Sequence, residues 1–162
     1  MNISRKKLRL GDLLVENRII QQEQLDAALE EQRKLGRKLG RILIDKGHLS
    51  EDALLSFLSH QLSVPFVDLA DIQFETALVQ LLPEIYARRF RALVLQDKGS
   101  SLLIGMSDPT NLFAYDELAR ILARPIDIAV VREQELLDVI ERVYKQNDRI
   151  SGIAEQLHGK RA

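Results

Sequence analysis

The sequence predicts an α+β protein built from two lobes. We expect an N-terminal lobe of four short helices, made of two tandem 24-residue motifs, over residues 8–62. A small α/β lobe with a roughly three-stranded sheet is expected over residues 63–146, and a polar tail or linker over residues 147–162. Two observations support this division: an internal repeat in the first third of the chain, and a change after residue 62 to strand-like segments alternating with helical ones.

The repeat aligns RLGDLLVENRIIQQEQLDAALEEQ (9–32) with KLGRILIDKGHLSEDALLSFLSHQ (38–61), at an offset of 29 residues and without a gap. Twelve of the 24 aligned positions agree in chemistry. The identical pairs are Leu10/Leu39, Gly11/Gly40, Leu14/Leu43, Leu25/Leu54, Leu29/Leu58 and Gln32/Gln61.

Each motif predicts two amphipathic helices, because its apolar residues recur twice at i, i+3 and i+4. Ser50 is a plausible N-cap for the second helix of the second motif, since Glu51 and Asp52 follow it in the first turn. Gly36 and Gly47 are expected to end helices.

The second lobe shows a different pattern from the repeat. We expect a short strand at 66–69, helices at 75–82 and 83–88, a hairpin of strands at 91–95 and 101–106, a helix at 112–123, a strand at 125–131 and a helix at 133–146. In the helix at 112–123, the apolar face is expected to hold Leu112, Tyr115, Leu118, Ala119 and Leu122.

Composition excludes several classes of function. The net charge of −1 argues against a general polyanion binder, and the absence of Cys excludes disulfides and thiolate sites. The three His form no metal-ligand motif, and no apolar run approaches the roughly 20 residues of a membrane span. There is no P-loop motif and no nucleophile–base arrangement, so we expect no catalytic residue, metal or cofactor in this chain. A reducing, cytoplasmic compartment is the default expectation.

Three features of the repeat suggest a ligand. Gly11 and Gly40 lie near helix starts, where a missing Cβ lets another group approach the backbone closely. Helix N-termini offer free N–H groups suited to phosphate. Gln32 and Gln61 continue the apolar stripes and need polar partners, although water at the helix edge is an equally good explanation for each.

A duplicated site suits a ligand with two like halves. The leucines would cover flat base or sugar surfaces, and the basic residue before each Leu-Gly would meet a phosphate or the O6 and N7 edge of guanine. Solvated surface charge is the simpler explanation for any one of these basic residues. In the second lobe Asp108 is the one site candidate, and a turn-forming role in its Asp-Pro pair is as good an explanation.

The tandem R-L-G-x-x-L…L-x-x-x-L-x-x-Q blocks, with VPFVDL and GMSDPTN after them, resemble the MshEN domain of type IV pilus extension and type II secretion ATPases. The resemblance covers residues 8–144 and implies a cytoplasmic regulatory domain that binds cyclic di-GMP, one motif for each half of the nucleotide. It also implies an ATPase motor domain outside this chain. A further implied partner is the cytoplasmic domain of an inner-membrane assembly protein, and binding to it would hold the domain at the periphery of that membrane. The implied ligand residues are Arg9, Leu10, Gly11, Leu25, Leu29, Gln32, Arg37, Lys38, Leu39, Gly40, Leu54, Leu58, Gln61 and Asp108.

The chain departs from the family pattern at two places. Lys38 replaces the Arg of the motif and cannot form the two-pronged pair that Arg makes with guanine, so the second half-site would contact phosphate instead, with Arg37 as a substitute cation. Arg18 stands where the second motif has Gly47.

Two other functions compete with nucleotide binding. The first is a protein–protein docking domain that needs no nucleotide and links the ATPase to an inner-membrane platform protein. The second is a helix-turn-helix DNA binder, which the near-zero net charge and the position of the basic residues at helix ends disfavour. We therefore expect neither DNA binding nor direct membrane insertion.

Overall fold

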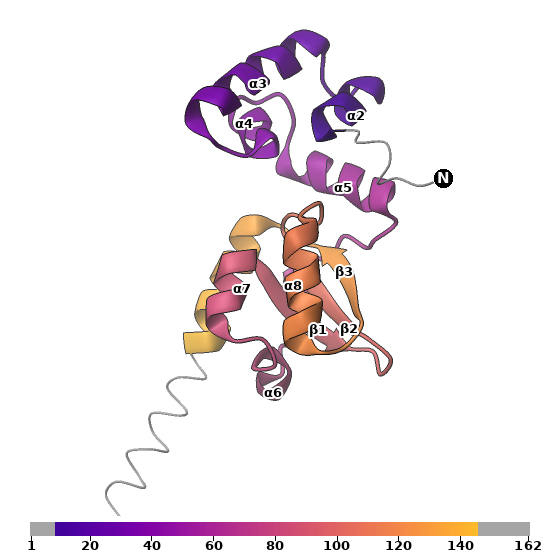
Figure 1. Cartoon of the computed structure of the whole chain (residues 1–162), viewed down its shortest axis with the longest axis vertical. Helices are drawn as coiled ribbons and strands as arrows, with labels where there is room; N and C mark the ends of the chain where they lie inside the picture. The colour runs from indigo at the N-terminus through magenta and orange to yellow at the C-terminus, as the bar shows by residue number, and fades with distance from the viewer. Residues whose placement is uncertain (1–8, 146–162) are drawn as a thin grey trace, which may run out of the picture. The chain divides into compact units, whose positions relative to one another are not determined.

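The computed structural model describes residues 9–145, and the expected tail at 147–162 lies outside the described residues. The chain forms two compact units whose boundary falls between Leu54 and Leu55 (Figure 1). This boundary lies inside α5 (Glu51–Leu62). The division at residues 62 and 63 that the sequence suggested stays a prediction.

The first motif folds into α2 (Leu10–Glu16) and α3 (Gln22–Leu35), and the second into α4 (Leu39–Asp45) and α5, as the repeat predicts. The predicted helix ends are confirmed. Gly36 ends α3 in the left-handed conformation, with φ 69°, and the Ser50 hydroxyl accepts a hydrogen bond from the Ala53 N–H at 3.0 Å at the start of α5.

In the second unit three strands form one mixed sheet in the order β1-β2-β3. β1 (Ala92–Asp97) and β2 (Leu102–Met106) are the antiparallel hairpin that the sequence predicts, and β3 (Ile126–Val130) runs parallel to β2. The parallel pair needs a crossover connection, which α8 (Leu112–Leu122) supplies. α6 (Thr76–Val79) and α7 (Glu84–Phe90) precede β1, and residues 133–145 are helical.

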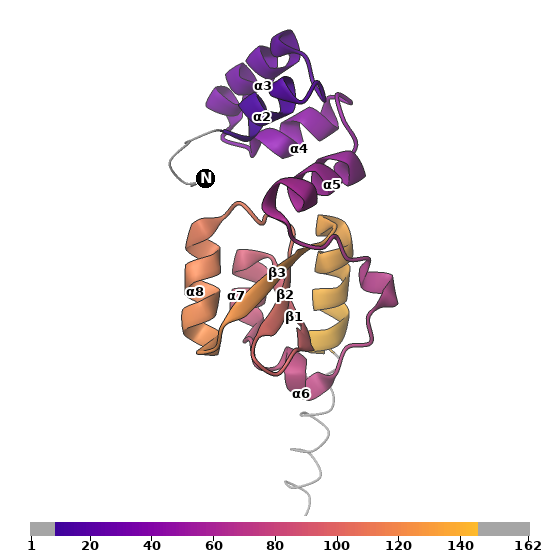
Figure 2. The ribbon, with the colours of Figure 1, turned by 90° about the vertical axis from the view of Figure 1, so that its right-hand side faces the viewer.

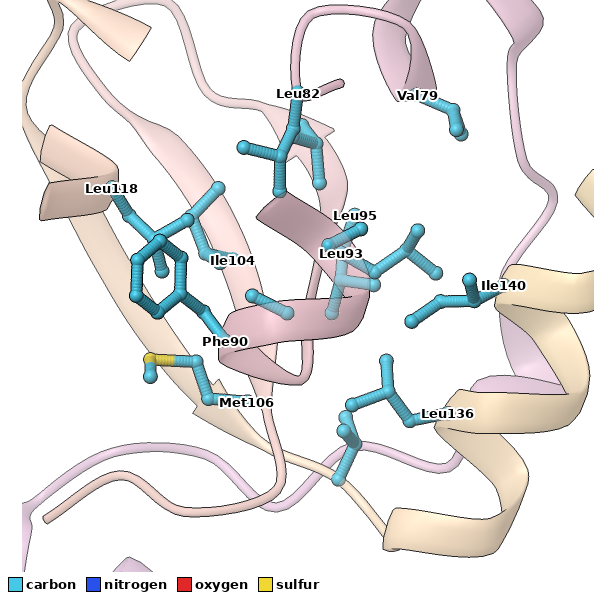
Figure 3. Close-up of a cluster of buried hydrophobic side chains, with 14 of the residues drawn as sticks. Val79, Leu82, Phe90, Leu93, Leu95, Ile104, Met106, Leu118, Leu136 and Ile140 are labelled. Carbon is cyan, nitrogen blue, oxygen red and sulfur yellow. The ribbon is translucent and has the colours of Figure 1, made fainter. Parts of the chain in front are cut away.

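The core of this unit lies on the sheet. Figure 2 shows α8 and the helix of residues 133–145 on opposite faces of the sheet. Ile104 on the central strand is fully buried, and Figure 3 shows it among the side chains of this core. The other labelled members of the cluster are Val79, Leu82, Phe90, Leu93, Leu95, Met106, Leu118, Leu136 and Ile140.

Two polar groupings hold the ends of the sheet and of the last helix. At the hairpin tip, Arg124 donates to the Asp97 carboxylate at 2.8 Å and lowers its pKa, while Ser101 and then Lys98 lower the pKa of Asp127 by donating to its carboxylate. The Tyr144 hydroxyl donates to the Leu82 carbonyl at 2.6 Å, and its burial raises its pKa above the usual value.

The expected strand at 66–69 is reduced to a single parallel bridge between Phe66 and Val130. The reason is Asp68, whose side chain accepts from the Ala70 N–H and begins the 3-10 helix η1 (Leu69–Asp71). A local side-chain hydrogen bond therefore replaces the ladder that the apolar residues suggested.

The apolar face expected for α8 is partly wrong. Leu112 is 69% exposed and Tyr115 38% exposed, whereas Ala114 and Leu118 are fully buried. Two overlapping apolar stripes run along this helix, and the buried one contains the small Ala114. Periodicity alone does not choose between such stripes, since a small residue lets the helix approach its neighbours more closely.

Candidate ligand-binding site

The two Leu-Gly corners have the same local shape. Arg9 is the N-cap of α2, with φ −80° and ψ 152°, and Lys38 is the N-cap of α4, with φ −66° and ψ 139°. Both are extended residues directly before a seven-residue helix. The sequence repeat is therefore a structural repeat at the positions proposed to meet the ligand.

The corners lie together in the first unit and interlock. A Cβ placed on Gly11 would overlap the Leu25 side chain and lie 3.1 Å from Leu39 Cδ2. A Cβ on Gly40 would lie 2.8 Å from Leu54 Cδ2 and 3.8 Å from Leu10 Cδ2. Each glycine is thus covered by a leucine of its own motif and touched by the corner leucine of the other motif.

This arrangement identifies what approaches the glycines. The sequence suggested that a ligand approaches these glycines, whereas the approaching groups in the structure are leucine methyls of the same chain. Packing therefore accounts for both glycines, and their role in ligand binding stays a prediction. Leu25, Leu54 and Leu58 are buried, at 1%, 7% and 6% exposure. Leu10, Leu29 and Leu39 are half-buried, so among the leucines of the predicted ligand set these three present apolar surface to solvent.

The basic residues of the two corners differ in their surroundings. Arg37 forms an ion pair with Asp45, and nearby Arg41 lies 3.4 Å from Glu51. Among residues 9–145 the exposed Arg9 has no carboxylate partner. Solvent-exposed ion pairs contribute only about 0–1 kcal/mol. Breaking the Arg37–Asp45 ion pair therefore costs little free energy.

The two glutamines are half-buried near the ends of their helices. Within the part of the chain that the structure describes, neither side-chain amide has a hydrogen-bond partner, so both can serve an outside group or water. Gln32 belongs to the first unit, whereas Gln61 and Leu58 lie in the part of α5 that belongs to the second. The place of these last two in a second half-site stays a prediction.

Asp108 forms the turn that its Asp-Pro sequence suggests. Its Oδ1 accepts from the Thr110 N–H at 3.1 Å and from the Thr110 hydroxyl at 2.5 Å, and Asn111 then caps α8 by accepting from the Ala114 N–H at 3.0 Å. The turn role is therefore established, and a ligand role stays a prediction.

Sequence reasoning missed a polar link between the two motifs. The Gln24 side chain accepts from the Gln21 N–H at 2.8 Å as part of a capping box, and its Nε2 lies 3.2 Å from His48 Nδ1. The capping-box motif S/T-x-x-E/Q requires Ser or Thr at the N-cap, and this chain has Gln21 there, so the motif does not identify this helix start.

Arg18 adopts the left-handed conformation, with φ 60°, at the position where Gly47 has φ 79°. This conformation costs a residue with a Cβ about 1–2 kcal/mol. Glycine avoids that cost, but it loses more conformational entropy on folding, which offsets part of the gain. We expect Arg18→Gly to stabilise the first unit by about 0.5–1 kcal/mol, measured by urea denaturation. The matched control, Arg18→Ala, keeps the Cβ and should show no gain; equal stabilisation by both variants would contradict this explanation.

No group of three or more His, Cys, Asp or Glu in residues 9–145 is arranged to hold a metal ion. In the same range no helix combines the length and hydropathy needed to cross a bilayer.

Comparison with known proteins places these features in context. Residues 62–150 match the family model of the MshEN domain. The chain is 36% identical over 138 residues to the type IV pilus assembly ATPase PilB of Myxococcus xanthus (strain DK1622), covering 85% of this chain and 24% of that protein. It thus spans about a quarter of the length of this curated relative.

Two solved structures share the fold. The structure of MshE with cyclic di-GMP is 45% identical, with a TM-score of 0.77, and the match covers 85% of this chain and 100% of that one. The N-terminal domain of XpsE has a TM-score of 0.68 at 22% identity, over 88% of this chain and 96% of that one, which is a likeness of fold.

Proposed function

The chain belongs to the MshEN-domain family, and from this we propose that it is a regulatory domain that binds cyclic di-GMP for a type IV pilus or type II secretion motor ATPase. The observation that carries the proposal is the pair of interlocked Leu-Gly corners, which supplies two like surfaces for a ligand with two like halves. The similarity to MshE with cyclic di-GMP supports the choice of ligand.

In this proposal the two motifs divide the nucleotide between them. Arg9 meets a guanine edge or a phosphate of the first half, where a planar guanidinium can pair with O6 and N7. Lys38 meets a phosphate of the second half as a point charge, and Arg37 joins it by leaving Asp45. Gln32 and Gln61 use their unpaired amides for hydrogen bonds to the bases.

The apolar residues take two roles. Leu10, Leu29 and Leu39 lie against the ligand, because they are half-buried in the free domain. Leu25 and Leu54 act by holding Gly11 and Gly40 in place, and the buried Leu58 completes the apolar wall of the second half-site. The backbone at the two Leu-Gly corners faces the phosphates.

Asp108 supplies the acceptor for guanine N1–H and N2–H. Asp108 belongs to the second unit, so nucleotide binding at this carboxylate would act on the conformation of that unit. This effect of the nucleotide would regulate the ATPase motor domain, which we place outside this chain. It would also regulate binding to a membrane-assembly partner in the cytoplasm.

Two substitutions in the first motif test the site. Arg9→Ala and Gln32→Ala should each weaken cyclic di-GMP binding by about 1–3 kcal/mol, the range for a lost charged or buried hydrogen bond, measured by calorimetric titration. Arg33→Ala is the matched control, because Arg33 is 76% exposed on α3, pairs with Glu30 and lies outside both motifs. Unchanged affinity in both site variants, with circular dichroism showing an intact fold, would refute these roles. Absence of cyclic di-GMP binding by the unsubstituted protein would instead favour nucleotide-independent docking.

A further inference from the structure

The first turn of α8 exposes two large apolar side chains directly after the Asp108 turn. Leu112 is 69% exposed and Phe113 is 68% exposed, while Ala114 and Leu118 of the same helix are fully buried. Single exposed apolar residues are common on protein surfaces. Here two such residues are consecutive in the sequence. They follow Asp108, whose carboxylate we propose accepts hydrogen bonds from guanine.

The ring of Phe113 is held from one side by an aromatic row on α7. It lies edge-to-face with Phe90, with ring centroids 6.2 Å apart and an interplanar angle of 63°. Phe90 is 8% exposed and stacks on Tyr86 at 6.3 Å. Figure 1 shows α7 and α8 as neighbours within this unit. Phe113 is therefore supported by a buried ring while most of its own surface meets solvent.

The carboxylate and the ring are fixed on one short segment. The Asn111 N–H donates to the Asp108 carbonyl at 3.3 Å, and the Asn111 side chain caps the helix by accepting from the Ala114 N–H at 3.0 Å. Thr110 holds the Asp108 carboxylate through two further hydrogen bonds. The turn thus keeps the Asp108 carboxylate and the first turn of α8, which carries Phe113, on one ordered segment.

Guanine is recognised by this combination of groups. Its N1–H and N2–H need an acceptor in the plane of the base, and its flat faces stack on aromatic rings. We propose that Phe113 is the stacking platform for the guanine whose N1–H and N2–H groups donate to the Asp108 carboxylate. This inference rests on the proposed binding of cyclic di-GMP and adds a base-contact residue to that site.

The absence of Trp from the chain allows a direct test. Phe113→Trp introduces a single indole, whose fluorescence is quenched when guanine stacks on it. We expect cyclic di-GMP to quench Phe113→Trp saturably, with a midpoint equal to the calorimetric dissociation constant. Ile85→Trp is the matched control, because Ile85 is 61% exposed near the opposite end of α7 from Phe90, and its signal should not change.

Affinity gives a second measurement. Phe113→Ala should weaken cyclic di-GMP binding roughly 5- to 150-fold, the range that stacking of one base on an aromatic side chain gives. Ile85→Ala should leave it unchanged.

The outcomes separate this inference from the proposed function. Calorimetric binding of cyclic di-GMP without quenching of Phe113→Trp, and with unchanged affinity of Phe113→Ala, would overturn the stacking role and leave the function standing. No calorimetric binding by the unsubstituted protein would overturn the proposed function itself. Equal quenching of Phe113→Trp and Ile85→Trp would show a nonspecific effect and would also overturn the stacking role.

Discussion

Replacing Leu25 by alanine is expected to destabilise the first unit by about 2–5 kcal/mol, the range for truncating a buried leucine. Leu25 is 1% exposed, and its methyls fill the space over Gly11. Its loss leaves a cavity at the first Leu-Gly corner, so we also expect cyclic di-GMP affinity to fall. Urea denaturation followed by circular dichroism measures the stability. Leu29→Ala, on the same helix but half-buried, is the control and should cost less.

A second substitution in the same place sharpens this test. Gly11→Ala alone puts a methyl group into the Leu25 side chain and should cost about 1–3 kcal/mol by overpacking. In the Leu25→Ala background the same methyl group enters the cavity, so the two effects should be far from additive. Additive losses, or a loss in Leu29→Ala as large as in Leu25→Ala, would contradict the interlocked corner.

Replacing Ile104 by alanine should destabilise the second unit by about 2–5 kcal/mol. Ile104 is fully buried within the core cluster (Figure 3). On the central strand it lies opposite Val94 on one neighbouring strand and Ile128 on the other. Chemical denaturation gives the change in unfolding free energy. The half-buried Leu103 is next to it on the same strand, and Leu103→Ala should cost clearly less. Equal losses would contradict the central place of Ile104 in the core.

Much of the fold follows from the sequence by local rules. The repeat predicts four helices in two matched pairs, and Gly36 and Ser50 mark helix ends, because capping depends on a few neighbouring residues. The hairpin and the strand at Ile126–Val130 follow from apolar segments separated by turn residues.

What the sequence did not predict depends on packing between distant elements. Helical periodicity identifies apolar stripes on α8 but not the one that the sheet covers, so it predicts a buried Leu112 and gives no signal for the exposed Phe113. The ion pair between Arg37 and Asp45 depends on the direction of α4 relative to the loop that precedes this helix, and the sequence repeat contains no signal for that direction. At Gly11 the sequence suggests that some group lies close to the backbone, and only the structure identifies that group as the side chains of Leu25 and Leu39.

The central claim is that the paired Leu-Gly corners of this chain bind a guanine dinucleotide. A calorimetric titration of the unsubstituted protein with cyclic di-GMP, beside GTP and cyclic di-AMP, tests it most directly. We predict saturable binding of cyclic di-GMP at micromolar concentrations, with much weaker responses to the other two nucleotides. A folded protein that gives no saturable heat with cyclic di-GMP, or that binds cyclic di-AMP equally well, would contradict the account.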